Sequence, residues 1–321
     1  MILVTGGTGF VGYHLVRRLL AEGHGVRVVT RNPPSASAVG PEYIRGDLSD
    51  LDSLTRALNG VRTVVHLAAC LESPRVPPGD FERVNVAGTA LLARCACAAG
   101  VERIVHASSA GVYGDGNREV AHREGDPVNP STPYEHSKVH SERVLRETLE
   151  GTSTSWVVLR PAGIYGPGRP ATASFFRQVQ MRHTWLHSGA RVIVHPTFVD
   201  DMVHAVRSAL ERKEAAGLVF NIAGERALPF PELVALVGVR LGRTPRQITA
   251  PRWVSMTART WTRAAEVLGR QPPGIVARLG REILNRSLDT TQARVGLSFA
   301  PVPLEEGIDR TITWMRNEAM L

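Results

Sequence analysis

The sequence has 321 residues, 43% of them hydrophobic, which is enough apolar material for one large domain or two closely packed ones. Its formal net charge is +8, but aromatic residues make up only 6% and no basic block is interleaved with them, so binding of nucleic acid is not favoured. No apolar run approaches the roughly 20 residues that a membrane-spanning helix needs.

The first predicted element is a strand that breaks into a glycine-rich turn. An apolar run over residues 2–5 leads into Gly6, Gly9 and Gly12, and apolar residues at helical spacing follow. Glycines at this spacing let the backbone turn and approach a pyrophosphate, while the N–H groups of the first helical turn face the phosphates. The sequence therefore predicts a dinucleotide-binding turn between a strand and a helix.

Strand-like runs then alternate with helix-like segments. The runs are residues 2–5, 26–30, 63–67, 103–107 and 155–159. This alternation predicts an α/β fold, a Rossmann-type doubly wound parallel sheet that binds its ligands at the carboxyl ends of the strands.

The alternation becomes irregular after Gly166. We therefore expect a dinucleotide-binding domain over residues 1–165. Residues 191–223 are expected to return to its sheet with one more helix and strand. Residues 166–190 and 224–321 are expected to form a smaller C-terminal substrate-binding lobe.

A second motif, Tyr134-Glu-His-Ser-Lys138, places a tyrosine and a lysine four residues apart. On a helix this spacing puts both side chains on one face. A lysine ammonium near a phenol favours the phenolate and lowers its pKa from about 10, which makes a general acid/base. Ser109, just after the run 103–107, is placed to donate a hydrogen bond to a substrate oxygen. The alternatives are a surface helix and a turn serine bonded to its own backbone.

Eight motifs spread over most of the chain belong together. They are Thr5-Gly-Gly-Thr-Gly-Phe-Val-Gly12, Gly46-Asp-Leu48, His66-Leu-Ala-Ala69, Asn85-Val-Ala-Gly-Thr89, Ser108-Ser-Ala-Gly-Val-Tyr-Gly114, Tyr134 to Lys138, Arg160-Pro-Ala-Gly-Ile-Tyr-Gly-Pro-Gly168 and Phe198-Val-Asp-Asp201. In combination they resemble the extended short-chain dehydrogenases of the NAD-dependent epimerase/dehydratase family.

The resemblance implies roles for individual residues. Ser109, Tyr134 and Lys138 would be catalytic, with Lys138 also contacting the nicotinamide ribose and Asn85 helping to order the active site. The family pattern also implies a homodimer through helices around residues 81–99 and 134–149. The expected cofactor-binding residues are Gly6, Gly9, Phe10, Val11, Gly12, Asp47, Leu48, Leu67, Ala68, Ala69, Asn85, Tyr134, Lys138, Pro161 and Ile164.

Departures from the family pattern narrow the expectation. Thr30-Arg31 stands where NAD-preferring relatives carry an acid, and an arginine suits a 2′-phosphate, so NADP is favoured over NAD. Ala110-Gly111 follows Ser109 where sugar 4,6-dehydratases have Asp-Glu, and no cysteine occurs between Val101 and Lys138. Hydride transfer alone remains, by a C4-type epimerase or by a one-way reductase or dehydrogenase.

The substrate is expected to be a small molecule, with a nucleotide sugar ahead. Its tentative contacts are Ser109, Tyr113, Arg191 and His195. The alternative is a steroid-like or flavonoid-like alcohol or ketone, in a pocket lined by Phe175, Phe176, Trp185 and Leu186 unless these side chains simply pack the lobe. A non-catalytic redox sensor with this fold is a third possibility, which the presence of both Tyr134 and Lys138 disfavours.

Metal binding and secretion are not expected. The pairs His136/His140 and His183/His187 have a zinc-like spacing but lack the accompanying acid. Three cysteines cannot all pair and have no metal-ligand spacing, which fits a reducing compartment. Because no signal-like leader precedes the first predicted strand, we expect a cytoplasmic protein.

Overall fold

The predicted fold class is confirmed by a seven-stranded, wholly parallel sheet in the order β11-β6-β5-β4-β1-β2-β3. The computed structural model describes residues 1–34, 40–72, 76–114, 120–181, 183–186, 192–244, 246–249, 252–267 and 286–321. The sheet strands are β1 (Ile2–Thr5), β2 (Val26–Thr30), β3 (Glu42–Arg45), β4 (Thr63–His66), β5 (Arg103–Ala107), β6 (Ser155–Pro161) and β11 (Leu218–Ile222).

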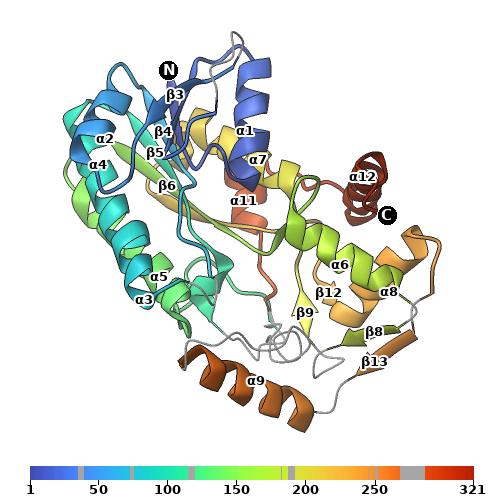
Figure 1. Ribbon diagram of the computed structural model, residues 1–321. Helices are drawn as coiled ribbons and strands as arrows, with labels where there is room; N and C mark the ends of the chain where they lie inside the picture. The colour runs from blue at the N-terminus through green and yellow to red at the C-terminus, as the bar shows by residue number, and fades with distance from the viewer. Residues whose placement is uncertain are drawn as a thin grey trace.

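Helices cover both faces of this sheet (Figure 1). One face packs against α2 (Leu51–Leu58), α4 (Gly88–Ala98) and α5 (Pro133–Leu149), and the other against α1 (Phe10–Ala21) and α7 (Val199–Glu211). Successive strand residues serve opposite faces: Leu3 joins the first core and Val4 the second, and Val64 and Val65 divide in the same way. Burial on both faces explains why these strands are continuous apolar runs.

Local capping fixes where α5 begins. The side chain of Thr132 accepts a hydrogen bond from the backbone N–H of Glu135, the Glu135 carboxylate accepts from the Thr132 N–H, and Pro133 occupies the first helical position. Before α4, residues Pro78–Phe81 form α3 and residues Glu82–Ala87 form η1, a π-helical segment. Such segments are rare and are frequent at functional sites.

The remaining elements form a second, smaller part beside the sheet (Figure 1). Its core joins α6, α8 and α12 through residues such as Phe176, Val234 and Ile308. The chain returns to the large sheet through α7 and β11. The elements of this part are β7 (Ile164–Tyr165), α6 (Pro170–Gln180), β8 (His183–Leu186), β9 (Ile193–Val194), β10 (Thr197–Phe198), β12 (Leu228–Pro229), α8 (Phe230–Arg240), β13 (Arg246–Thr249), α9 (Arg252–Val267) and α12 (Leu304–Asn317), whereas α11 (Thr291–Gly296) packs against β11 in the core of the large sheet.

Within the ranges given above, no helix has the length and apolar character needed to cross a membrane. In the same part of the chain, no three His, Cys, Asp or Glu side chains come together in a way that would hold a metal ion.

Candidate active site

The glycine turn (residues 6–12) joins the carboxyl end of β1 to the start of α1. Gly6 has φ +72°, and a Cβ there would lie 2.7 Å from the backbone nitrogen of Ala68. A Cβ on Gly12 would lie 2.1 Å from the Gly6 carbonyl oxygen. The backbone therefore approaches itself too closely for any side chain at these two positions.

The start of α1 adds backbone donors to the same turn. Gly9 caps α1 without a side chain, and the first turn of the helix carries no acidic residue. The first N–H groups of a helix have no acceptor within the helix and carry its positive dipole end. A cradle of such donors, which a side chain would fill, fits the diphosphate of a dinucleotide.

The expected adenosine side lies at the ends of the next strands. Asp47 accepts hydrogen bonds from the N–H and the hydroxyl of Ser49, at 2.9 and 2.7 Å. These bonds, and more weakly the charges of Arg31 and Arg83, lower the pKa of Asp47. Arg31 is exposed at the end of β2. Leu48 is buried, while Leu67, Ala68 and Ala69 are partly exposed just beyond β4, as lining residues would be.

Tyr134 and Ser109 are brought together as predicted. Their side chains are hydrogen-bonded, which lowers the pKa of Tyr134, but burial raises that pKa more strongly. The Ser109 hydroxyl also accepts from the Gly111 N–H at 3.0 Å. The expectation that Lys138 lowers the phenol pKa is not met in this arrangement, because burial sets the direction of the shift.

Lys138 is 3% exposed and lies one turn beyond Tyr134. Its ammonium donates to the Ala107 carbonyl at 2.8 Å. Burial lowers the pKa of Lys138 to about 8, against the opposing charge of Glu142. The lysine thus reaches the carboxyl end of β5, beside Ser109, rather than solvent.

Asn85 connects α5 to the segment that follows β4. Its side-chain amide donates to the Ser137 hydroxyl at 2.8 Å and to the Cys70 carbonyl at 3.1 Å, and its oxygen accepts from the Cys70 N–H at 2.7 Å. Ser137 in turn donates to the Tyr134 carbonyl. The ordering role that the family resemblance implies for Asn85 therefore has contacts that can perform it.

Two of the tentative substrate residues lie in the interior. Tyr113 is 2% exposed, and its hydroxyl donates to the Asn221 side-chain oxygen and accepts from the Arg160 guanidinium. His195 accepts from the Leu288 N–H at Nδ1 and donates to the Gly224 carbonyl at Nε2. These contacts occupy the polar atoms of both residues, so a substrate role for either stays a prediction that its surroundings do not favour. Arg191 lies outside the described residues.

Two of the four residues expected to line an apolar pocket are packed in the smaller part. Phe176 is 2% exposed and belongs to the core of the smaller part, where Phe175 packs against Phe230. Packing of the lobe, the plainer of the two interpretations, accounts for both phenylalanines. The side chains of Trp185 and Leu186 lie outside what is described. At the expected nicotinamide side, Pro161 ends β6 and Ile164 begins β7.

Two arginines that were not predicted as site residues from the sequence lie near Tyr134. Arg169, at the start of α6, places its guanidinium 5.8 Å from the centre of the Phe10 ring. Burial lowers the pKa of Arg169, and the charge of the Tyr134 phenolate opposes this shift. Arg286 pairs with the Glu135 carboxylate, and its charge lowers the pKa of Tyr134. Its Nε atom is buried without a hydrogen-bond partner among the described atoms.

Only Arg169 had a usable signal in the sequence. It follows directly on the Arg160 to Gly168 motif, at the carboxyl end of a strand, whereas Arg286 has no local pattern around it.

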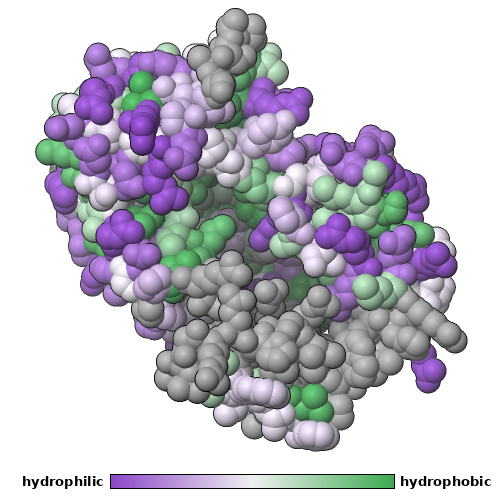
Figure 2. All heavy atoms as spheres, viewed as in Figure 1, coloured by the Kyte–Doolittle hydropathy of each residue, from purple (hydrophilic) through white to green (hydrophobic). Residues whose placement is uncertain are grey.

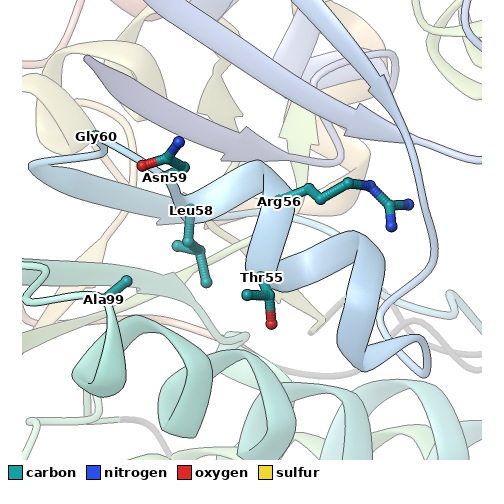
Figure 3. Close-up of a pocket in the computed structure, with 6 residues that line it drawn as sticks. All are labelled: Thr55, Arg56, Leu58, Asn59, Gly60 and Ala99. Carbon is teal, nitrogen blue, oxygen red and sulfur yellow. The ribbon is translucent and has the colours of Figure 1, made fainter.

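Surface hollows elsewhere do not compete with this site. The groove in Figure 3 is lined by the end of α2 and by Ala99, at the amino ends of the strands, whereas ligands of open α/β sheets bind at the carboxyl ends. A second hollow is lined mainly by α12. Figure 2 shows a further hollow between the two parts of the molecule, with hydrophobic residues along it.

Comparisons with known proteins agree with this arrangement. The sequence model of the NAD dependent epimerase/dehydratase family matches residues 2–223. The chain is 32% identical over 340 residues to a UDP-glucose 4-epimerase of Mycolicibacterium smegmatis, covering 99% of both chains. It is 33% identical over 219 residues to a 3 beta-hydroxysteroid dehydrogenase/Delta 5-->4-isomerase of Mycobacterium tuberculosis, covering 63% of this chain and 58% of the other. Its structure resembles that of MoeE5 in complex with UDP-glucuronic acid and NAD, with a TM-score of 0.78, 28% identity and 99% of both chains covered.

Proposed function

The chain belongs to the NAD-dependent epimerase/dehydratase family, and from this premise we propose that it transfers hydride between a nicotinamide cofactor and a secondary alcohol or ketone of a nucleotide sugar. The observation that carries the substrate class is the pair of cations beside the Tyr134 phenol. Arg169 and Arg286 come from separate segments; Arg286 is paired with the buried Glu135 carboxylate, whereas Arg169 makes no ion pair with a described carboxylate.

In the proposed mechanism each of the three predicted catalytic residues has a separate task. Ser109 donates a hydrogen bond to the substrate oxygen, and Tyr134 takes the hydroxyl proton in oxidation and returns it in reduction. Lys138 holds the ribose and supplies a positive charge behind the phenol. When bound, the nicotinamide ring accepts or supplies the hydride. Tyr134 is half-buried, which limits the access of water to the proton transfer.

The two arginines favour an anionic substrate. A guanidinium binds phosphate or carboxylate oxygens through paired N–H donors, and its attraction is stronger where water is excluded. Arg286 has a buried Nε donor to offer, and Arg169 makes no ion pair with a described carboxylate. A nucleoside diphosphate sugar, or a sugar acid, supplies the missing acceptors.

We also propose NADP as the preferred cofactor. Arg31 is exposed at the end of β2, and its charge already acts on Asp47 at the adjoining strand end. A 2′-phosphate on the adenosine ribose would lie within reach of such a cation.

A homodimer through α4 and α5 remains part of the proposal. The large hydrophobic side chains exposed in the described part of the chain lie on neither helix, so this face would associate through polar groups. Charged residues such as Arg143 and Glu147 stand on its exposed positions. We therefore expect an association that weakens with salt, which light scattering at low and high ionic strength would measure.

One observation favours a second candidate function, oxidation or reduction of an apolar alcohol or ketone. Hydrophobic residues gather along the hollow between the two parts (Figure 2). One of the relatives described above is a hydroxysteroid dehydrogenase.

Thermal denaturation of the cofactor-loaded protein separates the two candidates. A ligand that binds the native state raises the melting temperature by mass action. Uridine diphosphate, UDP-glucose and UDP-glucuronic acid test the first candidate, and a hydroxysteroid with its ketone tests the second. Stabilisation by the nucleotides that is lost in Arg286→Met supports the nucleotide-sugar proposal. Stabilisation by the steroid pair alone would replace it with the second.

A further inference from the structure

His66, the last residue of β4, is 1% exposed and has a hydrogen-bond partner at each ring nitrogen. Its Nδ1 lies 2.7 Å from the Thr5 hydroxyl, and its Nε2 lies 2.9 Å from the Thr89 hydroxyl. The proposed mechanism gives this buried histidine no task.

The direction of each bond around His66 follows from its neighbours. Thr89 donates its hydroxyl proton to the Asn85 carbonyl at 2.6 Å, so its oxygen is left to accept from Nε2–H. A neutral imidazole protonated at Nε2 accepts at Nδ1, so Thr5 donates its hydroxyl proton there. The Thr5 oxygen in turn accepts from the Ala68 N–H at 3.3 Å. One tautomer therefore satisfies the whole chain of bonds.

The neutral form persists over the working pH range. Burial, helped by the nearby charge of Lys138, lowers the pKa of His66 to about 3. The chain of bonds is thus a fixed connection and not a titrating one.

The two ends of this chain of hydrogen bonds reach the two halves of the site. At one end Thr5 directly precedes the glycine turn, and Ala68 belongs to the expected lining of the nucleotide site. At the other end Asn85 bonds to Ser137, which bonds to the carbonyl of Tyr134. We propose that His66 is a positioning residue that couples the glycine turn to the start of α5, so that the bound cofactor and the Tyr134 phenol are held in register. This inference rests on the proposed role of Tyr134.

The neighbouring strand supplies a matched control. His106 is the register partner of His66 on β5, is also 1% exposed, and has its ring centre 5.0 Å from that of His66. Its Nε2 bonds to Ser141 at 3.1 Å, but its Nδ1 has no hydrogen-bond partner among the described atoms. His106 therefore ends on α5 and does not connect it to the glycine turn.

Two substitutions divide the proposed connection. In His66→Asn the amide oxygen replaces Nδ1 as acceptor for Thr5, but nothing reaches Thr89. In His66→Gln the amide nitrogen reaches toward Thr89, but Thr5 loses its acceptor. Each variant thus keeps one half of the chain of bonds and breaks the other.

The test measures cofactor Kd by fluorescence titration and kcat by absorbance of the reduced nicotinamide. We expect His66→Gln to weaken cofactor binding about tenfold with kcat within about twofold of wild type. We expect His66→Asn to lower kcat about tenfold, because a misplaced phenol slows proton transfer, while Kd stays within about twofold. His106→Gln and His106→Asn should lower the melting temperature without this division.

Amide hydrogen exchange gives a readout that does not need turnover. Faster exchange over residues 5–12 in His66→Gln, and over 133–141 in His66→Asn, is the expected result. If each His66 variant instead exchanges faster over both segments and changes Kd and kcat together, the coupling is overturned. If wild type binds no cofactor and turns over no substrate, the proposed function fails, and exchange alone then decides on the coupling. Should the His66 variants not fold, Thr5→Val and Thr89→Val make the same division with isosteric side chains.

Discussion

Arg160 on β6 and Glu142 on α5 are joined by two hydrogen bonds, Nε to Oε1 at 2.9 Å and Nη2 to Oε2 at 2.7 Å. Both side chains are almost completely buried, and Ser108 and Arg146 donate to the same carboxylate. This pair fastens the helix that carries Tyr134 and Lys138 to β6, the strand that ends at Pro161. The relation has a direct consequence for stability.

Glu142→Gln should destabilise the protein by about 3–5 kcal/mol, because it leaves the Arg160 guanidinium buried without its counter-charge. Urea unfolding followed by circular dichroism measures the change. Glu147→Gln is the control on the same helix, where the exposed pair with Arg143 spans 3.8 Å, and it should change stability by less than about 1 kcal/mol. Equal stability of the two variants would show that the buried pair does not hold α5 in place.

Tyr134→Phe should lower kcat by about a hundredfold or more while leaving cofactor affinity within about twofold, because only the proton-transferring hydroxyl is removed. Turnover with the substrate identified by thermal denaturation, and fluorescence titration of the cofactor, measure the two effects. Tyr13→Phe, which alters an exposed tyrosine on α1, serves as the control. A Tyr134→Phe variant that keeps most of its turnover would remove Tyr134 from the mechanism.

What the sequence predicts depends on whether the determining contacts are local. The five strands predicted from apolar runs lie within two residues of their predicted ends, because each run is buried on both faces of the sheet. Strand β3 was missed because Glu42–Arg45 lies at the edge, with its first and last residues exposed. Its sequence therefore lacks both an apolar run and a clear alternation.

The same reasoning applies to the contacts of the expected site residues. Ser109 and Tyr134 belong to motifs that carry their own strand end and helix start. Tyr113 and His195 were tentative substrate contacts, and their hydrogen-bond partners, Asn221 and Gly224, lie 108 and 29 residues away along the chain. Only the folded structure shows that these polar atoms are already paired.

The stability of the protein should fall as the pH drops below about 6.5. Burial lowers the pKa of His195 to about 4, whereas in the unfolded chain a histidine titrates near 6.5. Between these two pH values this histidine binds a proton in the unfolded state but not in the native state. The stability contribution is therefore complete above pH 6.5 and is lost as the pH falls toward about 4. Over that range the contribution of this residue amounts to about 3 kcal/mol.

Comparison with His195→Gln isolates the effect of this histidine. The amide nitrogen of glutamine can still donate to the Gly224 carbonyl, but the side chain does not titrate. Urea unfolding at pH 7.5 and pH 4.5 should show a smaller loss of stability in the variant than in wild type. An identical loss in both proteins would mean that His195 takes up its proton without unfolding.

Arg31→Ala should weaken NADP binding about tenfold or more and leave NAD binding nearly unchanged, because only NADP carries the 2′-phosphate that a charge-assisted hydrogen bond would hold. Titration of both cofactors into both proteins measures the ratio of the two Kd values. Arg17→Ala, on the outer face of α1 where the guanidinium lies over Tyr13, removes the same charge far from the strand ends and should leave the ratio unchanged. Equal affinity of wild type for NAD and NADP would remove the cofactor preference. If the Arg31 variant keeps a preference for NADP, another cation binds the 2′-phosphate. The candidate is Arg83, whose charge also acts on Asp47.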